Sequence, residues 1–110
     1  LVIVQHDPLK SNGQEFVTIA FELKLSNWQK ALAQASCYKA FANKAYVLID
    51  NTYVNRPLNN LYRFERANVG LLSINGKGRV FIHHEAQYAE PYSEWYEKVF
   101  RDIVFKEKEG

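Results

Sequence analysis

A glutamate and a lysine stand two positions apart inside an apolar segment of this 110-residue chain. Alternation of side chains along the segment, Ala20 to Leu25, predicts a β-strand that places Glu22 and Lys24 on one face. A carboxylate can hold Mg²⁺, which activates water, and a neighbouring ammonium can offset the charge on a phosphate. The pair therefore suits hydrolysis of a phosphodiester. A salt bridge on the surface of a strand is the plainer interpretation of the same residues.

Two further polar residues follow on the next predicted helix. Gln34 and Tyr38 stand four positions apart, so they share one helix face. The apolar character of residues 16–25 favours a central strand, where a charged pair needs partners or a chemical task. These four polar residues therefore form one candidate site. An ordinary helix surface with a half-buried tyrosine is the plainer interpretation of Gln34 and Tyr38.

Hydrophobic periodicity predicts the elements that would position these residues. Ser26 is the expected N-cap of the helix that carries Gln34 and Tyr38. Tight turns are expected at Asn12-Gly13 and at residues 75–78. The expected strands cover residues 1–4, 16–25, 45–49, 69–74 and 79–83, and the expected helices cover residues 27–43, about 57–66 and 92–106. This order predicts an α/β fold, with a mixed β-sheet flanked by helices.

Composition indicates one globular domain over residues 1–110, with 47% hydrophobic and 24% charged residues. No apolar run approaches roughly 18 residues, which argues against a membrane protein. The single cysteine, Cys37, favours a reducing, cytoplasmic setting. The absence of methionine indicates an N-terminally incomplete fragment. Residues 1–80 hold ten Lys/Arg against five Asp/Glu, whereas residues 81–110 hold four against seven, so the first part could face a polyanion.

The stretch from Phe21 to Ala35 resembles the core of the PD-(D/E)XK nuclease superfamily, which has the restriction-endonuclease-like fold. The spacing of Gln34 and Tyr38 is similar to the Gln-x-x-x-Tyr helix motif of its RecB-type exonuclease branch. The resemblance covers roughly residues 1–82. It implies a Mg²⁺-dependent deoxyribonuclease that hydrolyses DNA phosphodiesters, with Mn²⁺ able to replace Mg²⁺ and DNA as the partner.

The same resemblance implies a role for each residue of the site. Glu22 would be a metal ligand, the backbone carbonyl of Leu23 a second metal contact, and Lys24 the catalytic lysine. Gln34 and Tyr38 would help to place the nucleic-acid strand or would support the lysine. A catalytically inactive nucleic-acid-binding or protein-interaction module on the same fold is the alternative function.

The chain departs from the family's pattern, because the strand before Glu22 lacks the second metal-binding acid. The only upstream aspartate is Asp7. The predicted first turn would place Glu22 opposite Val2 or Ile3, and Asp7 would lie about four residues, or ~13 Å, farther along the strand. Two carboxylates that share Mg²⁺ must lie within about 5 Å of each other. We therefore expect the second acid, and the family's first helix, upstream of Leu1.

Other residues give weaker indications. Lys30, Lys39 and Arg56 are candidates for contacts with the DNA backbone, which would make binding weaken with salt. His83 and His84 are poor joint metal ligands, because neighbouring residues on a strand point to opposite faces. An aromatic cluster suggests core packing or the contact of a homodimer, and its members are Tyr88, Tyr92, Trp95, Tyr96 and Phe100.

Overall fold

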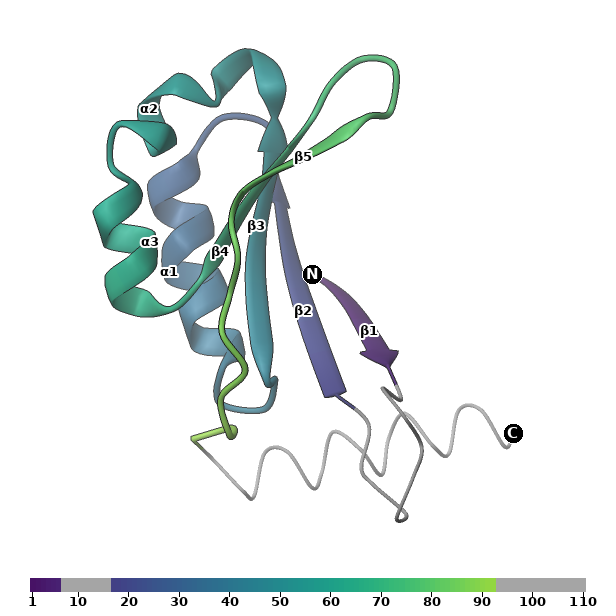
Figure 1. Cartoon of the computed structure of the whole chain (residues 1–110), viewed down its shortest axis with the longest axis vertical. Coiled ribbons are helices and arrows are strands. Elements are labelled where there is room, and N and C mark those ends of the chain that lie inside the picture. Colours follow the sequence, from purple (N-terminus) through teal and green to yellow (C-terminus); the bar gives the residue numbers. More distant parts are fainter. Residues whose placement is uncertain (7–16, 93–110) are drawn as a thin grey trace.

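A computed structural model describes residues 1–6 and 17–92 of the chain, with the side chains of residues 1–3 and 17–92. Its strands form one sheet and lie side by side in chain order: β1 (Val2–His6), β2 (Val17–Lys24), β3 (Lys44–Asp50), β4 (Gly70–Ile74) and β5 (Val80–His84). Strands β2, β3 and β4 are parallel, whereas β1 and β5 are antiparallel to their neighbours (Figure 1). The predicted α/β class and mixed sheet are confirmed. The expected turn at residues 12–13 lies outside the described residues, as does the expected helix over 92–106 beyond Tyr92.

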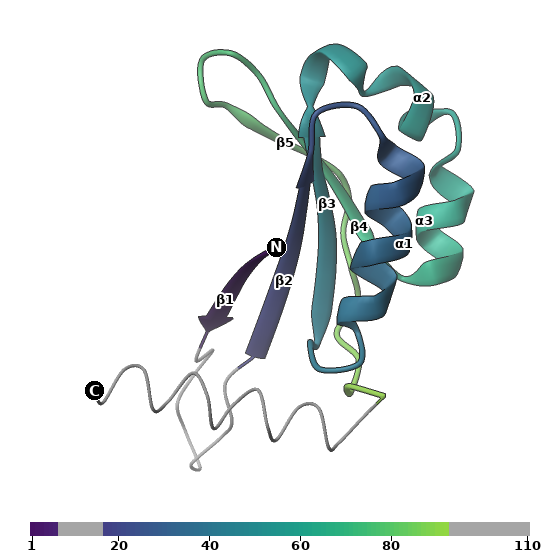
Figure 2. The same ribbon diagram turned by 180° about the vertical axis from the view of Figure 1, so that it is seen from behind.

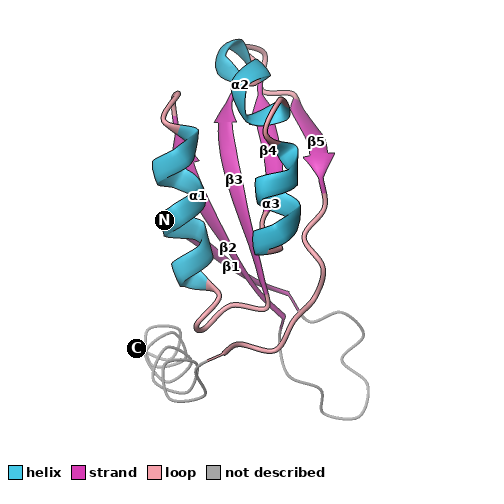
Figure 3. Ribbon diagram, turned by 90° about the vertical axis from the view of Figure 1, so that its left-hand side faces the viewer, coloured by secondary structure: helices cyan, strands magenta, loops and turns pink. Residues whose placement is uncertain are grey.

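The described helices cover one face of the sheet (Figures 1 and 3). They are α1 (Trp28–Tyr38), the 3₁₀ turn η1 (Asn51–Tyr53), α2 (Asn55–Leu58) and α3 (Leu61–Ala67). The view from behind shows no described helix on the other side (Figure 2). In the described part of the chain, no helix has the length and apolar character needed to cross a membrane.

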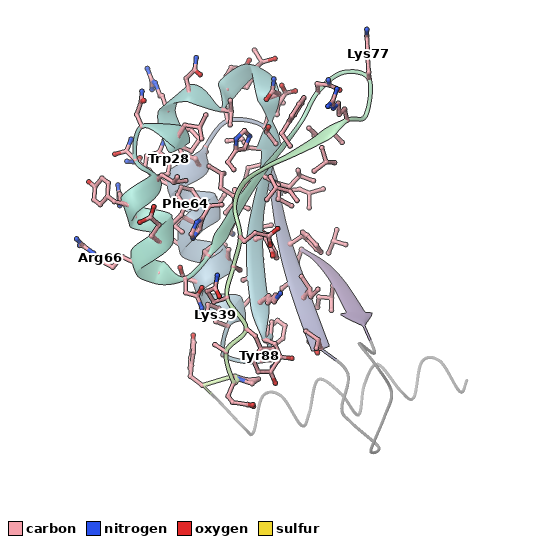
Figure 4. All side chains as sticks on the ribbon, in the orientation of Figure 1. Trp28, Lys39, Phe64, Arg66, Lys77 and Tyr88 are labelled. Carbon is pink, nitrogen blue, oxygen red and sulfur yellow. The ribbon has the colours of Figure 1, made fainter. Side chains whose placement is uncertain are left out.

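The main hydrophobic core lies between these helices and the sheet. The buried stripe of α1 consists of Trp28, Ala31, Leu32 and Ala35, at the predicted helical spacing. The ring of Trp28 packs against that of Phe64 in α3, with ring centroids 5.9 Å apart (Figure 4). Burial of this stripe fixes α1 against β2 and β3, in the parallel crossover that the sequence predicts.

Helix α1 is shorter than the predicted helix at both ends. Asn27, and not Ser26, is the N-cap, because its side-chain oxygen accepts a hydrogen bond of 3.2 Å from the backbone N–H three residues later. The helix ends at Tyr38 and not at Asn43, because the sheet holds Asn43. The side-chain oxygen of Asn43 accepts a hydrogen bond of 2.9 Å from the backbone N–H of Thr18. A tertiary contact therefore decides where the helix ends.

The single helix predicted over residues 57–66 is instead the pair α2 and α3. Helix α2 begins at Asn55, two residues before Pro57, which therefore lies in the first turn. Proline is tolerated there because the first N–H groups of a helix have no intrahelical acceptor. Helix α3 ends at Ala67, and its C-cap Asn68 adopts the left-handed conformation with a φ of 53°.

Strands β1 and β2 pair in a different register from the predicted one. Val2 lies opposite Phe21, which puts Leu1, and not Val2 or Ile3, opposite Glu22. The offset is one to two residues toward the start of the chain. The Asn-Gly pair alone does not determine this register.

The observed register bears on the distance between Asp7 and Glu22. His6 pairs with Val17, five positions from Glu22, which corresponds to ~17 Å along the strand. Asp7 follows His6 and lies outside the described residues. The end of β1 at His6 therefore lies far from Glu22 along the sheet.

Candidate active site

The Glu22 carboxylate lies on the face of β2 that the helices cover, and only 5% of the residue is exposed. The hydroxyl of Tyr38 donates a hydrogen bond of 2.6 Å to its Oε1. The Nζ of Lys24 lies 3.7 Å from Oε2. One hydroxyl donor and one side-chain cation thus compensate in part for the lost hydration of this carboxylate.

Tyr38 reaches Glu22 from the last turn of α1. Helical side chains point back toward the start of their helix, so the tyrosine extends toward the middle of β2. Burial and the hydrogen bond to Glu22 raise the pKa of Tyr38 to about 12. The hydroxyl therefore remains a donor at neutral pH. The resemblance implies that Tyr38 contacts the nucleic acid or supports Lys24. In the structure, the hydroxyl of Tyr38 instead contacts the carboxylate of Glu22.

Gln34 lies one helical turn before Tyr38, on the same face of α1. Its Oε1 is buried and has no hydrogen-bond partner among the described residues. An unpaired buried carbonyl costs about 1–3 kcal/mol. The structure therefore places Gln34 on the helix face of Tyr38, with no partner for its side-chain carbonyl among the described residues.

Two oxygen groups beside Lys24 suit Mg²⁺. Oε2 of Glu22 has a contact of 3.7 Å with Lys24, which is too long for a direct hydrogen bond. The carbonyl of Thr18 faces β3, since it accepts a hydrogen bond from Asn43, and carbonyl directions alternate along a strand. The carbonyl of Leu23 therefore faces the β1 edge, where no described residue stands opposite it.

These two oxygens are the kind of ligand that Mg²⁺ prefers. The ion is commonly held by one or two carboxylates, with water and substrate phosphates completing its coordination. Glu22 and Leu23 stay the ligands that the family resemblance implies. Nowhere among the described residues do three or more His, Cys, Asp or Glu side chains gather. A second acid upstream of Leu1 stays a prediction.

The three candidate DNA-backbone contacts lie in different surroundings. Lys39 donates hydrogen bonds to the carbonyls of Ala67 and Asn68, at 3.4 and 3.2 Å, and burial lowers its pKa. Lys39 thus joins the end of α1 to the end of α3. Lys30 and Arg56 are exposed. Of the three candidates, these two therefore have exposed side chains that can contact a polyanion.

A polar network in the same row of the sheet was not predicted. Lys24 pairs with Ile49, and Ile49 pairs with Ser73. The buried Ser73 hydroxyl donates a hydrogen bond of 2.8 Å to the side chain of Asn51 and lies 2.7 Å from Nε2 of His83. Burial lowers the pKa of His83. The sequence feature that could have indicated this network is Ser73, a single polar residue inside an apolar strand.

Comparison of the chain with protein-family models, with curated protein sequences and with solved structures finds no match.

Proposed function

We propose that this chain is the core of a metal-dependent DNA nuclease on a restriction-endonuclease-like fold. The observation that carries the proposal is the buried Glu22 carboxylate, held between the Tyr38 hydroxyl and the Lys24 ammonium. These are three of the four side chains that the resemblance assigns to the site. A mixed sheet with helices against it is in keeping with that fold.

The arrangement is costly for a protein that needs only stability. Moving a carboxylate from water to a protein interior costs several kcal/mol, even after relaxation. The contact between Glu22 and Lys24 is too long for a direct hydrogen bond. The neighbours of Glu22 in the sheet, Ala20 and Val47, are apolar and fully buried. A leucine in place of Glu22 would suit these surroundings better. The unpaired oxygen of Gln34 adds to the cost, and a chemical task accounts for both residues.

Each residue has its own task in the proposed reaction. Glu22 and the carbonyl of Leu23 would hold Mg²⁺, which supplies charge stabilisation at the phosphate and activates a water when bound. The Lys24 ammonium orients the attacking water and offsets the charge that develops on the phosphate oxygens. Tyr38 fixes the orientation of the Glu22 carboxylate through its hydrogen bond. Gln34 would help to place the nucleic-acid strand, as the resemblance implies.

Metal-dependent cleavage of DNA tests the proposal. The full-length parent protein is compared with its Glu22→Gln and Lys24→Ala variants, and with the surface controls Glu65→Gln and Lys77→Ala. Lys77 stands at the tip of the β4–β5 turn, far from the helices (Figure 4). We expect each site variant to lose on the order of 10²–10³-fold in cleavage rate, because each removes a charge aimed at the reacting groups. Undiminished cleavage by both site variants would show that the site is wrong.

A non-catalytic module on the same fold is the alternative, and one observation favours it. Both oxygens of Glu22 have partners in the protein itself, so the carboxylate could serve as a salt bridge alone. DNA binding by the unaltered chain, without cleavage in Mg²⁺ or Mn²⁺, would support this alternative. A cytoplasmic location and a homodimer stay predictions from the sequence.

A further inference from the structure

A concave region lies beyond the C-terminal ends of β2 and β3. One of its walls is the β2–α1 connection with the start of α1, and the other is η1 with the start of α2. The cavity has a volume of about 640 Å³ and is lined by Ser26, Asn27, Trp28, Gln29, Thr52, Tyr53, Asn55 and Arg56. Ligand pockets commonly have volumes of about 300–1,000 Å³. A single nucleotide therefore fits this space.

The chemistry of the lining favours an anion that carries a flat ring. Each of the described lining residues has a polar group, none of them is acidic, and Arg56 is their cation. The guanidinium of Arg56 presents donors that match a phosphate. Tyr53 is 46% exposed, so its ring can stack on a base. The amides of Gln29 and Asn55 offer both donors and acceptors to base edges.

The cavity lies next to the candidate active site. Ser26 follows Lys24 by two residues, so their Cα atoms are at most about 7.6 Å apart. The other wall follows Asp50 at the end of β3, and Ile49 of that strand pairs with Lys24. Both walls therefore begin at the edge of the sheet that carries Lys24. When a phosphate lies at Glu22 and Lys24, the neighbouring nucleotide of the same strand comes within reach of the cavity.

Hydrogen bonds to the sheet fix the wall that carries Tyr53 and Arg56. The Ser73 hydroxyl holds the side chain of Asn51 at 2.8 Å. The carboxylate of Asp50 accepts a backbone N–H of η1 at 2.8 Å. A wall that is ordered before binding loses little conformational entropy when a ligand enters.

We infer that this cavity binds the nucleotide next to the scissile phosphate, with its base against Tyr53 and its phosphate on Arg56. The inference rests on the proposed nuclease function for the identity of the ligand. Every base has a face that can stack on an aromatic ring. The cavity therefore contributes affinity for the strand more than preference for a sequence.

Binding of labelled oligonucleotides, measured by fluorescence anisotropy in EDTA, tests the inference without metal-dependent cleavage. Tyr53→Ala is expected to weaken binding about tenfold, and Tyr53→Phe to retain it, because the phenyl ring still stacks. Arg56→Gln is expected to weaken binding and to lower its salt dependence by about one phosphate contact.

The matched controls are Tyr62→Ala and Arg66→Gln, which alter an exposed tyrosine–arginine pair on α3. The guanidinium of Arg66 lies 5.9 Å from the ring centre of Tyr62, and Figure 4 shows Arg66 pointing away from the sheet. Neither residue lines the cavity. These controls have the same chemistry as Tyr53 and Arg56 in a different place, and we expect them to bind like the unaltered chain.

The possible outcomes separate this inference from the proposed function. A loss of affinity in the Tyr53 and Arg56 variants, but not in the α3 controls, supports binding in the cavity. Equal losses in the α3 controls indicate diffuse electrostatic binding and overturn the inference. Unchanged binding by Tyr53→Ala in a chain that cleaves DNA overturns the cavity and keeps the nuclease. Binding through Tyr53 without cleavage in Mg²⁺ keeps the cavity and overturns the nuclease. A chain that binds no nucleic acid overturns both.

Discussion

On β2, Glu22 and Lys24 point toward α1, whereas Phe21 and Leu23 point to the opposite face, which no described helix covers (Figures 1 and 2). Glu22 is buried, while 48% of Leu23 is exposed. Sheets with one covered face normally place their apolar residues on that face and polar residues on the other. The rule is inverted at this end of β2, and the buried Ser73 of β4 is a further polar residue on the covered face.

Apart from Ser73, the neighbouring strands follow the usual rule on the covered face. Val47 and Ile49 of β3 and Leu71 of β4 are fully buried beneath the helices. The covered face therefore has an apolar core under α1 and α3, and polar groups near the ends of β2 and β4. The core provides most of the free energy of folding, and this surplus allows the site to contain buried polar groups.

The open face is stabilised by local aromatic contacts. The rings of Phe21 and Tyr46 stack with centroids 5.5 Å apart, and the Tyr46 hydroxyl donates a hydrogen bond of 2.9 Å to Glu85. The Tyr46 ring also lies where a side chain at position 70 would be, which explains Gly70. These contacts cover the middle of the open face but leave Leu23 and Ile82 exposed.

The largest expected effect compares two leucines on the two faces. Leu71→Ala removes a fully buried side chain from the core and should lower the free energy of unfolding by about 2–5 kcal/mol. Leu23→Ala removes a half-exposed side chain and should cost less than about 1 kcal/mol, because less area returns to water. Urea unfolding of both variants checks this difference. Equal costs would mean that the open face is covered in solution.

The next effect concerns the polar site itself. The double variant Glu22→Leu/Lys24→Leu replaces a partly buried charge pair with apolar groups, which is commonly neutral or stabilising by about 1–4 kcal/mol. We expect the variant to unfold at the same or a higher urea concentration and to have no metal-dependent cleavage. Marked destabilisation would contradict the view that this pair is kept for chemistry, and would assign it a structural role.

The prediction from sequence succeeded where local pattern and burial agree. The run from residue 45 to 49 is apolar and rich in β-branched residues, and it forms β3. The helical spacing of Trp28, Ala31 and Ala35 predicted the buried face of α1. Both patterns are repeated over several residues, so an error at a single residue would not have changed the result.

The prediction from sequence failed where one distant contact decides. Asn43 was expected to end a helix, but the helix ends five residues earlier, at Tyr38, and Asn43 bonds to Thr18 and Ala89 instead. The partner of Tyr38 depended on the same kind of contact. Spacing placed Tyr38 beside Gln34, but only the packing of α1 on β2 decides that its hydroxyl reaches Glu22. Contacts between residues far apart in sequence have no local signature.

The smallest expected effect isolates the contact between Tyr38 and Glu22. Tyr38→Phe keeps the ring but removes one donor from the buried Glu22 carboxylate, which keeps its contact with Lys24, so the free energy of unfolding should fall by about 1 kcal/mol at neutral pH. Cleavage should fall as well, because the carboxylate loses the group that orients it. A variant with full activity would limit Tyr38 to a structural role.

Alkaline pH gives this contact a second signature. The pKa of Tyr38 is raised from 10.0 to about 12 by burial and by the bond to Glu22, so the folded chain holds this proton more tightly than the unfolded chain. The resulting stability is fully present below about pH 10 and is lost as the pH rises from 10 to 12. Burial and the bond to Glu85 also raise the pKa of Tyr46, so a decline of the same sign persists in Tyr38→Phe. Unfolding free energies measured across this range should therefore decline less steeply in Tyr38→Phe than in the unaltered chain. Parallel curves would mean that the hydroxyl does not bind the carboxylate in solution.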